Sequence, residues 1–339
     1  MKDSDPSNIA TVSSHFVDDW LTALQSCTSP VQLVSMLKRS GMHTNQGRLV
    51  HRVTLDHIVR LYQIAAIETE DEMMGLWSRP IRARALQHLL TTVREATSLP
   101  SALYRFSSFW NLLLDDFQFE LVDEGGRISL RLLPCTDQPV QRFGHLLILK
   151  LAHGLMSWLA GYEVPVVAVQ FAFERPAFAA DYSVIFPVTA SFSAPVSAIS
   201  FAPEKLGLPG TRSSSELNDF LNRAPRDWIF TSFREHSQSL RVREFLYQSN
   251  WENCHLNEAA EMLKVTPRTL IRRLGAEGTS FQEIKDGLRR DIAIRDLQSG
   301  RKSIEEISQD VGFSSAANFH RAFRRWTGVT PRSYRHTSP

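Results

Sequence analysis

Arginines gather on two short stretches near the C-terminal end of the sequence, PRTLIRRLGAEG and AANFHRAFRRW. In each stretch, leucines or aromatic residues recur three or four positions apart, which predicts a helix with its arginines on the outer face. A guanidinium group binds a phosphate, or O6 and N7 of guanine, through paired hydrogen bonds. The pattern therefore indicates a nucleic-acid interface. Its arginines are Arg268, Arg272, Arg273, Arg321, Arg324 and Arg325.

The second stretch completes a helix–turn–helix pattern over about 303–326, here called the second motif. Ser303, followed by two glutamates, suits the start of a helix. Gly312 suits its end, because glycine readily takes the left-handed conformation of a tight stop. Ser314 or Ser315 is then expected to cap a helix that enters the major groove. The apolar positions expected to face inward are Ile304, Ile307, Val311, Phe319, Phe323 and Trp326.

A first motif of the same kind is predicted at about 257–277. Asn257 is expected to cap its first helix and Thr266 its second, with Pro267 at the first helical position. A longer helix over 281–297 then bridges the two motifs. The residues of the second helix expected to face inward are Leu270 and Leu274.

These stretches resemble the AraC/XylS-type transcription regulators through GFS at 312–314, NFHRAFR at 318–324 and GVTPRSYR at 328–335. The resemblance covers 239–337. It implies an all-α domain with two helix–turn–helix motifs joined by a linker helix. Such a domain would bind double-stranded DNA in two successive major grooves, about one helical turn (roughly 34 Å) apart.

The resemblance also implies which side chains contact DNA. Ile271, Ala316 and Ala317 offer only apolar contacts, so the first motif is expected to supply most of the hydrogen-bonded base readout. Thr269 and Ser315 belong to the same surface. The positions expected at bases are Arg268, Ile271, Arg272, Ala316, Ala317, Asn318, His320 and Arg321. The positions expected at phosphates, which orient without specifying sequence, are Arg273, Arg289, Arg324 and Arg325.

Charge is distributed in agreement with this interpretation. Residues 250–339 hold 15 Lys/Arg against 11 Asp/Glu, a net charge of +4, whereas the preceding residues carry a net charge of −2. Three separated cysteines favour a reducing cytosol over a disulfide framework. The N-terminus lacks the features of a signal peptide, and His145, Lys150 and His153 interrupt the most apolar segment, which predicts a buried helix. A cytoplasmic protein with no membrane partner is expected.

The N-terminal part is predicted to be an α+β regulatory and dimerisation domain over 20–205, with helices first and a β-hairpin turning at Gly125-Gly126. Its FERPAF, VIFPV and AISFAPEKL segments resemble the arabinose-binding-type regulatory domain of one AraC branch. The predicted layout is a flexible 1–19, this domain, a linker and connecting helix over 206–238, and the DNA-binding domain over 239–337. The connecting helix is expected to run over 216–236.

Polar groups within the apolar segments of this domain are the candidates for effector binding. They could hold an anionic small molecule in a mostly apolar pocket. The alternative is that the histidines are hydrogen-bonded core residues and the lysine reaches towards water. No cofactor is implied, and no CxxC or HxxxH spacing suggests a metal site. The candidates are His145, Lys150, His153 and Gln170.

The function expected from these features is sequence-specific regulation of transcription, controlled by a small-molecule effector and not enzymatic. The resemblance favours activation, contact with RNA polymerase and a homodimer. One alternative is a ligand-independent dimeric regulator. A less favoured alternative is a DNA-repair protein that transfers an alkyl group to Cys254. Its neighbour His255 lacks the geometry of an activating base, so a structural cysteine is preferred.

Overall fold

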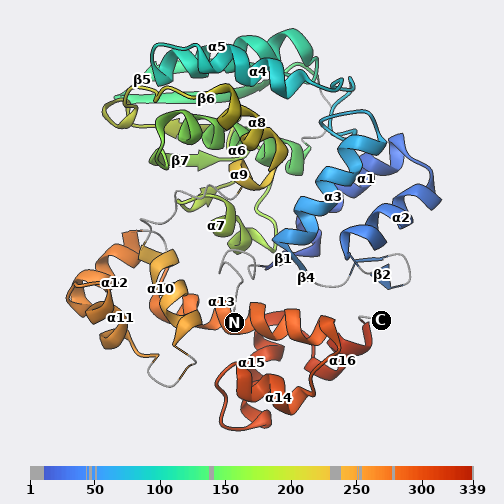
Figure 1. Ribbon diagram of the computed structural model, residues 1–339, viewed down its shortest axis with the longest axis vertical. Helices are drawn as coiled ribbons and strands as arrows, with labels where there is room; N and C mark the ends of the chain where they lie inside the picture. The colour runs from blue at the N-terminus through green and yellow to red at the C-terminus, as the bar shows by residue number, and fades with distance from the viewer. Residues whose placement is uncertain are drawn as a thin grey trace. The chain divides into compact units, whose positions relative to one another are not determined.

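The computed structural model describes residues 11–42, 44–45, 48–49, 52–136, 141–229, 238–249, 251, 254–276 and 279–337 (Figure 1). The contacts divide the chain into two compact units. The sheet unit contains His15–Ser40 and Val59–Arg234. The helix–turn–helix unit contains Met1–Ser14, Gly41–Ile58 and Glu235–Pro339.

In the sheet unit, helices precede the strands of the five-stranded sheet, as the spacing of apolar residues predicts. In α5, for example, Leu103, Phe106 and Trp110 recur at helical spacing and are fully buried. The Ser98 hydroxyl caps this helix by accepting a hydrogen bond from the Ser101 amide at 3.2 Å. The helices are α1 (Asp18–Cys27), α2 (Pro30–Ser40), α3 (Leu55–Glu68), α4 (Ala85–Arg94) and α5 (Leu99–Leu113).

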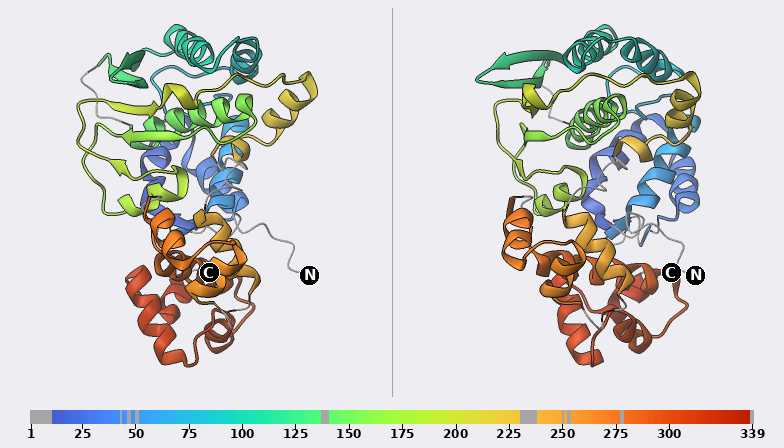
Figure 2. Two further views of the ribbon diagram at one scale, coloured as in Figure 1. Left: turned by 90° about the vertical axis from the view of Figure 1, so that its left-hand side faces the viewer. Right: turned by 60° about the vertical axis from the view of Figure 1, so that its left-hand side comes forward.

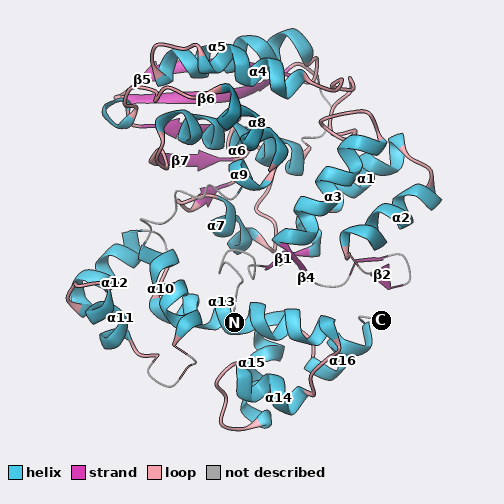
Figure 3. Cartoon of the chain, viewed as in Figure 1, coloured by secondary structure: helices cyan, strands magenta, loops and turns pink. Residues whose placement is uncertain are grey.

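A five-stranded sheet follows, in the order β5-β6-β9-β7-β8 (Figure 3). The predicted hairpin is confirmed, and its turn places Gly125 and Gly126 at positive φ, which glycine adopts without strain. The Asn111 side chain of α5 bonds both the amide and the carbonyl of Phe119, so the hairpin is attached to the helix. The strands are β5 (Phe117–Glu124), β6 (Arg127–Pro134), β7 (Val166–Gln170), β8 (Ala190–Ser191) and β9 (Ser197–Phe201).

The long apolar helix α6 (Arg142–Ala160) is the centre of the sheet unit (Figure 2). Every residue from Phe143 to Leu159 is buried. By length and composition alone, α6 is the one helix among the described residues that could cross a membrane. Because protein covers nearly all of it, α6 is a core helix, as the sequence predicts.

The helices after α6 are shorter than predicted. Residues Ala179–Asp181 form a 3₁₀ turn, which is followed by the one-turn helix α7 (Tyr182–Ile185). The expected single helix over 216–236 is interrupted at Pro225, which lacks the amide that a continuous helix needs. Residues 230–236 of that prediction lie outside the described residues. The remaining elements here are two 3₁₀ turns, Ser14–Phe16 and Pro203–Lys205, and helices α8 (Ser214–Asn222) and α9 (Arg226–Ile229).

The C-terminal part of the helix–turn–helix unit is helical, as predicted (Figure 3). Leu270 of the first motif, Leu288 of the bridging helix and Phe319 of the second motif are all fully buried in one apolar core. The two motifs therefore share a single folded frame. The helices are α10 (Gln238–Gln248), α11 (Leu256–Met262), α12 (Pro267–Ala276), α13 (Phe281–Ser299), α14 (Ile304–Asp310), α15 (Ala316–Thr327) and α16 (Pro331–Thr337).

Two short strands from the beginning of the chain also belong to this unit. β1 (Thr11–Ser13) pairs antiparallel with β4 (Arg52–Thr54), and the Thr11 hydroxyl donates to Asp291 of α13 at 2.6 Å. The prediction of a flexible segment over 1–19 is therefore wrong from Thr11 onward. Three residues per strand carry too little pattern to be found in the sequence. The other strand pair is β2 (Thr44–Asn45) with β3 (Arg48–Leu49).

Candidate nucleic-acid interface

The first motif consists of α11, a tight turn and α12. Thr266 caps α12 as predicted, because its hydroxyl accepts a hydrogen bond from the Thr269 amide at 3.2 Å. The Thr269 hydroxyl lies 2.9 Å from that of Thr266, so it takes part in the cap. The residue at the N-cap of α11 is His255, and Asn257 lies inside the helix, which makes the predicted cap wrong.

The two faces of α12 differ as the sequence predicts. Leu270 and Leu274 are buried at 0% and 1% exposure. Ile271 is 57% exposed, although an isoleucine is usually buried. An exposed apolar side chain next to arginines is suited to contact the methyl group of a thymine. The arginines of the exposed face are Arg268, Arg272 and Arg273.

The second motif consists of α14, a turn and α15. Ser303 and Glu306 form a reciprocal capping box at the start of α14. Gly312 has a φ of +73° in the turn, as its position after the apolar stripe predicts. Of the two serines considered as the cap of α15, Ser315 accepts the bond from the Asn318 amide, at 3.3 Å.

The outer face of α15 carries the predicted reading residues. Phe319 and Phe323 are fully buried, which directs the intervening polar positions outward. Arg321 donates to the Asn318 side chain at 2.6 Å, so these two candidates form one hydrogen-bonded pair. Such a pair is preorganised to present its remaining donors together. The exposed positions are Ala317, Asn318, Arg321, Arg324 and Arg325, and the partly exposed ones are Ala316 and His320.

Two of the predicted phosphate-binding arginines contact the protein itself. Arg325 forms an ion pair with Asp286 of α13 at 3.0 Å, although its side chain is 69% exposed. Arg289 lies between the rings of Trp251 and Phe313, and it donates to the Gly312 carbonyl at 3.1 Å. Arg289 is therefore partly buried and engaged with protein groups, whereas its expected phosphate contact stays a prediction.

Cys254 is buried and engaged within the protein. Its sulfur lies 2.7 Å from the Ser249 hydroxyl, and its carbonyl accepts a hydrogen bond from Lys285 at 2.6 Å. These contacts, together with 1% exposure, are typical of a structural cysteine. In the described part of the chain, no three His, Cys, Asp or Glu side chains are grouped to hold a metal ion.

The four effector candidates of the sheet unit have partners within the protein. His145 lies 2.9 Å from the Ser197 hydroxyl, and burial lowers the pKa of His145 to about 4. Lys150 lies 3.0 Å from Nδ1 of His153. Since Nδ1 then accepts from the lysine, the opposite ring nitrogen of His153 donates to the Val164 carbonyl at 2.9 Å.

The structure brings only two of these candidates together. Lys150 and His153 contact each other, whereas His145 bonds Ser197 of β9 and Gln170 donates to the Val196 carbonyl at 3.1 Å.

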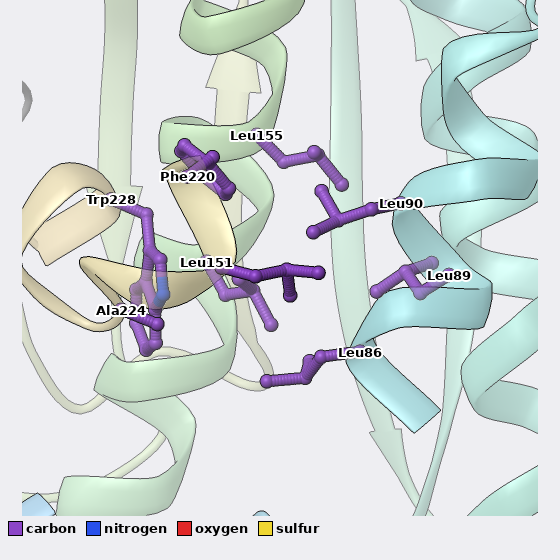
Figure 4. Close-up of a pocket in the computed structure, with 9 residues that line it drawn as sticks. Leu86, Leu89, Leu90, Leu151, Leu155, Phe220, Ala224 and Trp228 are labelled. Atoms are coloured by element: carbon purple, nitrogen blue, oxygen red, sulfur yellow. The ribbon is translucent and has the colours of Figure 1, made fainter. Parts of the chain in front are cut away.

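A separate cavity lies between α4, α6 and the α8–α9 segment (Figure 4). Its volume is about 10 Å³, which is room for about one water molecule. The surface that lines it is apolar, so it offers no hydrogen bond to a polar ligand. The sequence did not point to it because its walls come from helices far apart in the chain. Its lining residues are Leu86, Leu89, Leu90, Leu151, Leu155, Phe220, Leu221, Ala224 and Trp228.

The chain is similar to known regulators over most of its length. It is 28% identical to the Ornithine utilization regulator of Pseudomonas aeruginosa over 246 residues, which are 72% of each protein. It is 36% identical to the Urease operon transcriptional activator of Escherichia coli over 107 residues, which are 32% of this chain and 36% of that protein. The crystal structure of the transcriptional regulator CdpR from Pseudomonas aeruginosa aligns over 95% of this chain and 97% of its own, with 22% identity and a TM-score of 0.32.

Two family models match the chain. One, described as the N-terminal arabinose-binding domain of AraC transcription regulators, matches residues 35–209. The other, described as a helix-turn-helix domain, matches residues 259–337. Because the first match alone covers more than half of the chain and the second covers both arginine-bearing recognition helices, this protein belongs to the AraC family and is a DNA-binding transcription regulator.

Proposed function

We propose that this regulator reads a specific DNA site by inserting α12 and α15 into two successive major grooves. The observation that carries the proposal is that both helices expose their basic face while one apolar core fixes their opposite faces. A shared core keeps the two reading surfaces at a constant separation, which is what a two-groove site requires. Arg268 and Arg272 read bases in the first motif, and Arg324 holds a phosphate in the second.

The proposal extends to regulation. A small molecule bound by the sheet unit shifts the population of DNA-competent conformations, and the regulator activates transcription as a homodimer that contacts RNA polymerase. The arabinose-binding family match and the word activator in the name of the urease-operon relative support this part. The regulator acts in the cytoplasm and catalyses no reaction.

Sequencing of bound DNA tests the first part. Purified full-length protein is mixed with fragmented genomic DNA from its source, and the retained fragments are sequenced. We expect a small set of fragments that share two half-sites about one helical turn apart. An Arg272→Ala variant should retain the same fragments more weakly, with one base preference relaxed. Retention of random fragments by both proteins would contradict sequence-specific reading.

A second candidate function is regulation without any ligand. The observation that favours it is that His145, Lys150, His153 and Gln170 all bond other protein groups. Thermal unfolding across a metabolite panel distinguishes the two, because a ligand that binds the folded state raises its melting temperature. Ornithine belongs in the panel because of the relative's name. A melting temperature that no compound raises would favour the ligand-independent regulator.

A further inference from the structure

Arg289 of the bridging helix occupies a site made by the segment between α10 and α11 and by the turn of the second motif. Its guanidinium carbon lies 5.0 Å from the ring centroid of Trp251 and 4.8 Å from that of Phe313. Its Nη2 donates to the Gly312 carbonyl at 3.1 Å. A guanidinium group over an aromatic ring is held by cation–π attraction, and here two rings contribute. We call Trp251, Arg289, Gly312 and Phe313 the clamp.

The clamp residues come from three different parts of the frame. Trp251 lies between α10 and α11, on the side of the first motif, and Arg289 belongs to α13. Phe313 lies in the turn of the second motif and packs against Phe319 and Trp326. In addition, the indole of Trp251 donates to the Asp310 carbonyl at the end of α14 at 2.7 Å. The clamp therefore connects the segment that leads into the first motif to the turn that precedes the second recognition helix.

Gly312 is required for this contact as well as for the turn. A Cβ atom on Gly312 would lie 2.5 Å from Cβ of Trp251 and 3.2 Å from Nη2 of Arg289. The first of these distances is shorter than any real contact between such atoms, so a side chain at 312 would displace the indole. The close approach of Trp251 to the turn of the second motif thus depends on a residue with no side chain.

The position of Arg289 does not suit a phosphate contact. Its Nε is buried without an acceptor among the described residues, and burial lowers the pKa of the guanidinium. A phosphate-binding arginine instead presents its planar fork to solvent. The contacts of the Arg289 side chain therefore stabilise the packing of Trp251 and the bridging helix against the turn of the second motif.

We propose that Arg289 is a positioning residue: through the clamp it sets the separation and orientation of α12 and α15, and hence the half-site spacing that the regulator accepts. This inference rests on the proposed two-groove reading. Each base pair added between half-sites moves the second one by about 3.4 Å and rotates it around the DNA axis. If the clamp fixes α12 and α15, the protein binds weakly to half-sites at either altered spacing. If only α13 and the shared core hold these two helices, their separation adjusts to the altered spacing more easily.

The test measures the affinity of full-length protein for four duplexes. Three carry both half-sites at the native spacing, one base pair closer and one base pair further apart, and the fourth carries only the half-site of the first motif. Wild-type protein should prefer the native spacing strongly. Arg289→Met, which keeps an unbranched apolar stem but removes the guanidinium group and its charge, should reduce that preference about tenfold while leaving single-half-site binding unchanged.

Two further variants separate positioning from phosphate binding. Arg324→Met, at an exposed arginine of α15, should weaken all duplexes that contain the second half-site by the same factor. Arg289→Lys keeps a positive charge but cannot stack as a plane between two rings, so it should not restore the spacing preference. Trp251→Phe keeps one ring but loses the bond to Asp310, so it should give an intermediate preference.

Each outcome has a distinct meaning. Equal weakening of all four duplexes by Arg289→Met, with recovery in Arg289→Lys, would overturn the proposal in favour of a phosphate contact. A spacing preference unchanged in Arg289→Met would overturn it in favour of a frame fixed by the core alone. If wild-type protein showed no spacing preference, the two-groove reading itself would fail. Circular dichroism of each variant confirms that the comparison is made between folded proteins.

Discussion

Acidification should destabilise the sheet unit through His145. This histidine is 7% exposed and lies beside the rings of Trp77 and Phe117, with its Nδ1 against the Ser197 hydroxyl. Burial penalises the charged ring and lowers the pKa from 6.5 to about 4. The unfolded chain takes up its proton near the ordinary value, whereas the folded protein does not. The stability that the neutral ring provides is therefore complete above pH 6.5 and is lost as the pH falls towards 4.

The size of the effect follows from the interval between the two pKa values. Each pKa unit corresponds to about 1.4 kcal/mol, so full titration of His145 costs roughly 3 kcal/mol. Between about pH 7.5 and about pH 5, where only part of the interval is crossed, the loss is about 2 kcal/mol. Carboxylates also begin to titrate over this range. The contribution of His145 is therefore obtained by comparing the pH dependence of stability in wild-type protein with that in a variant that lacks this histidine.

The assay is urea unfolding followed by tryptophan fluorescence. Five of the seven tryptophans lie in the sheet unit, so the signal reports mainly on it. His145→Gln should be less stable than wild type at neutral pH because it loses ring packing. The gap between the two proteins should then narrow by about 2 kcal/mol as the pH is lowered to about 5. His88→Gln, at an exposed histidine, is the control for the His-to-Gln substitution itself. A constant gap for His145→Gln would refute the reasoning.

Three further perturbations have expected results. Arg272→Ala should weaken the cognate site by about 1–3 kcal/mol and relax one base preference, measured by competition with single-base variants of the site. Arg324→Ala should weaken cognate and random DNA alike and reduce the slope of log affinity against log salt by about 1, and an unchanged slope would count against a phosphate contact. Asp291→Asn should destabilise the helix–turn–helix unit by about 3–5 kcal/mol in thermal unfolding, because the buried carboxylate of Asp291 accepts hydrogen bonds from Arg243 and Thr11. A loss below about 1 kcal/mol would mean that water replaces the ion pair between Asp291 and Arg243.

Local patterns in the sequence were sufficient for most of the helix–turn–helix unit. Caps such as Thr266 and Ser303, the left-handed stop at Gly312 and the buried stripe of α15 depend on interactions within a few residues. For the same reason the two-glycine hairpin was predicted correctly. The predicted helix over 216–236 failed at Pro225, where the missing amide outweighs a favourable apolar pattern.

At the candidate site, the local sequence pattern does not distinguish a residue that contacts DNA from one that contacts the protein itself. An arginine on the outer face of a predicted helix looks the same whether it meets a phosphate, as proposed for Arg324, or is enclosed by two rings, as Arg289 is. Likewise, polar residues inside an apolar segment can be ligands or satisfied core groups. The structure gives His145 and Lys150 partners within the protein, and the apolar cavity between α4, α6 and the α8–α9 segment lies elsewhere.

The sequence by itself determined the family, the two motifs and the face that each recognition helix presents, because apolar periodicity and capping act between residues three or four positions apart. Only the tertiary structure decided that Thr11 meets Asp291, that Arg289 lies between Trp251 and Phe313, and that Cys254 is enclosed. These contacts join residues distant in the chain. They exist because packing against a common core brings such residues together, and no short-range pattern records which ones will meet.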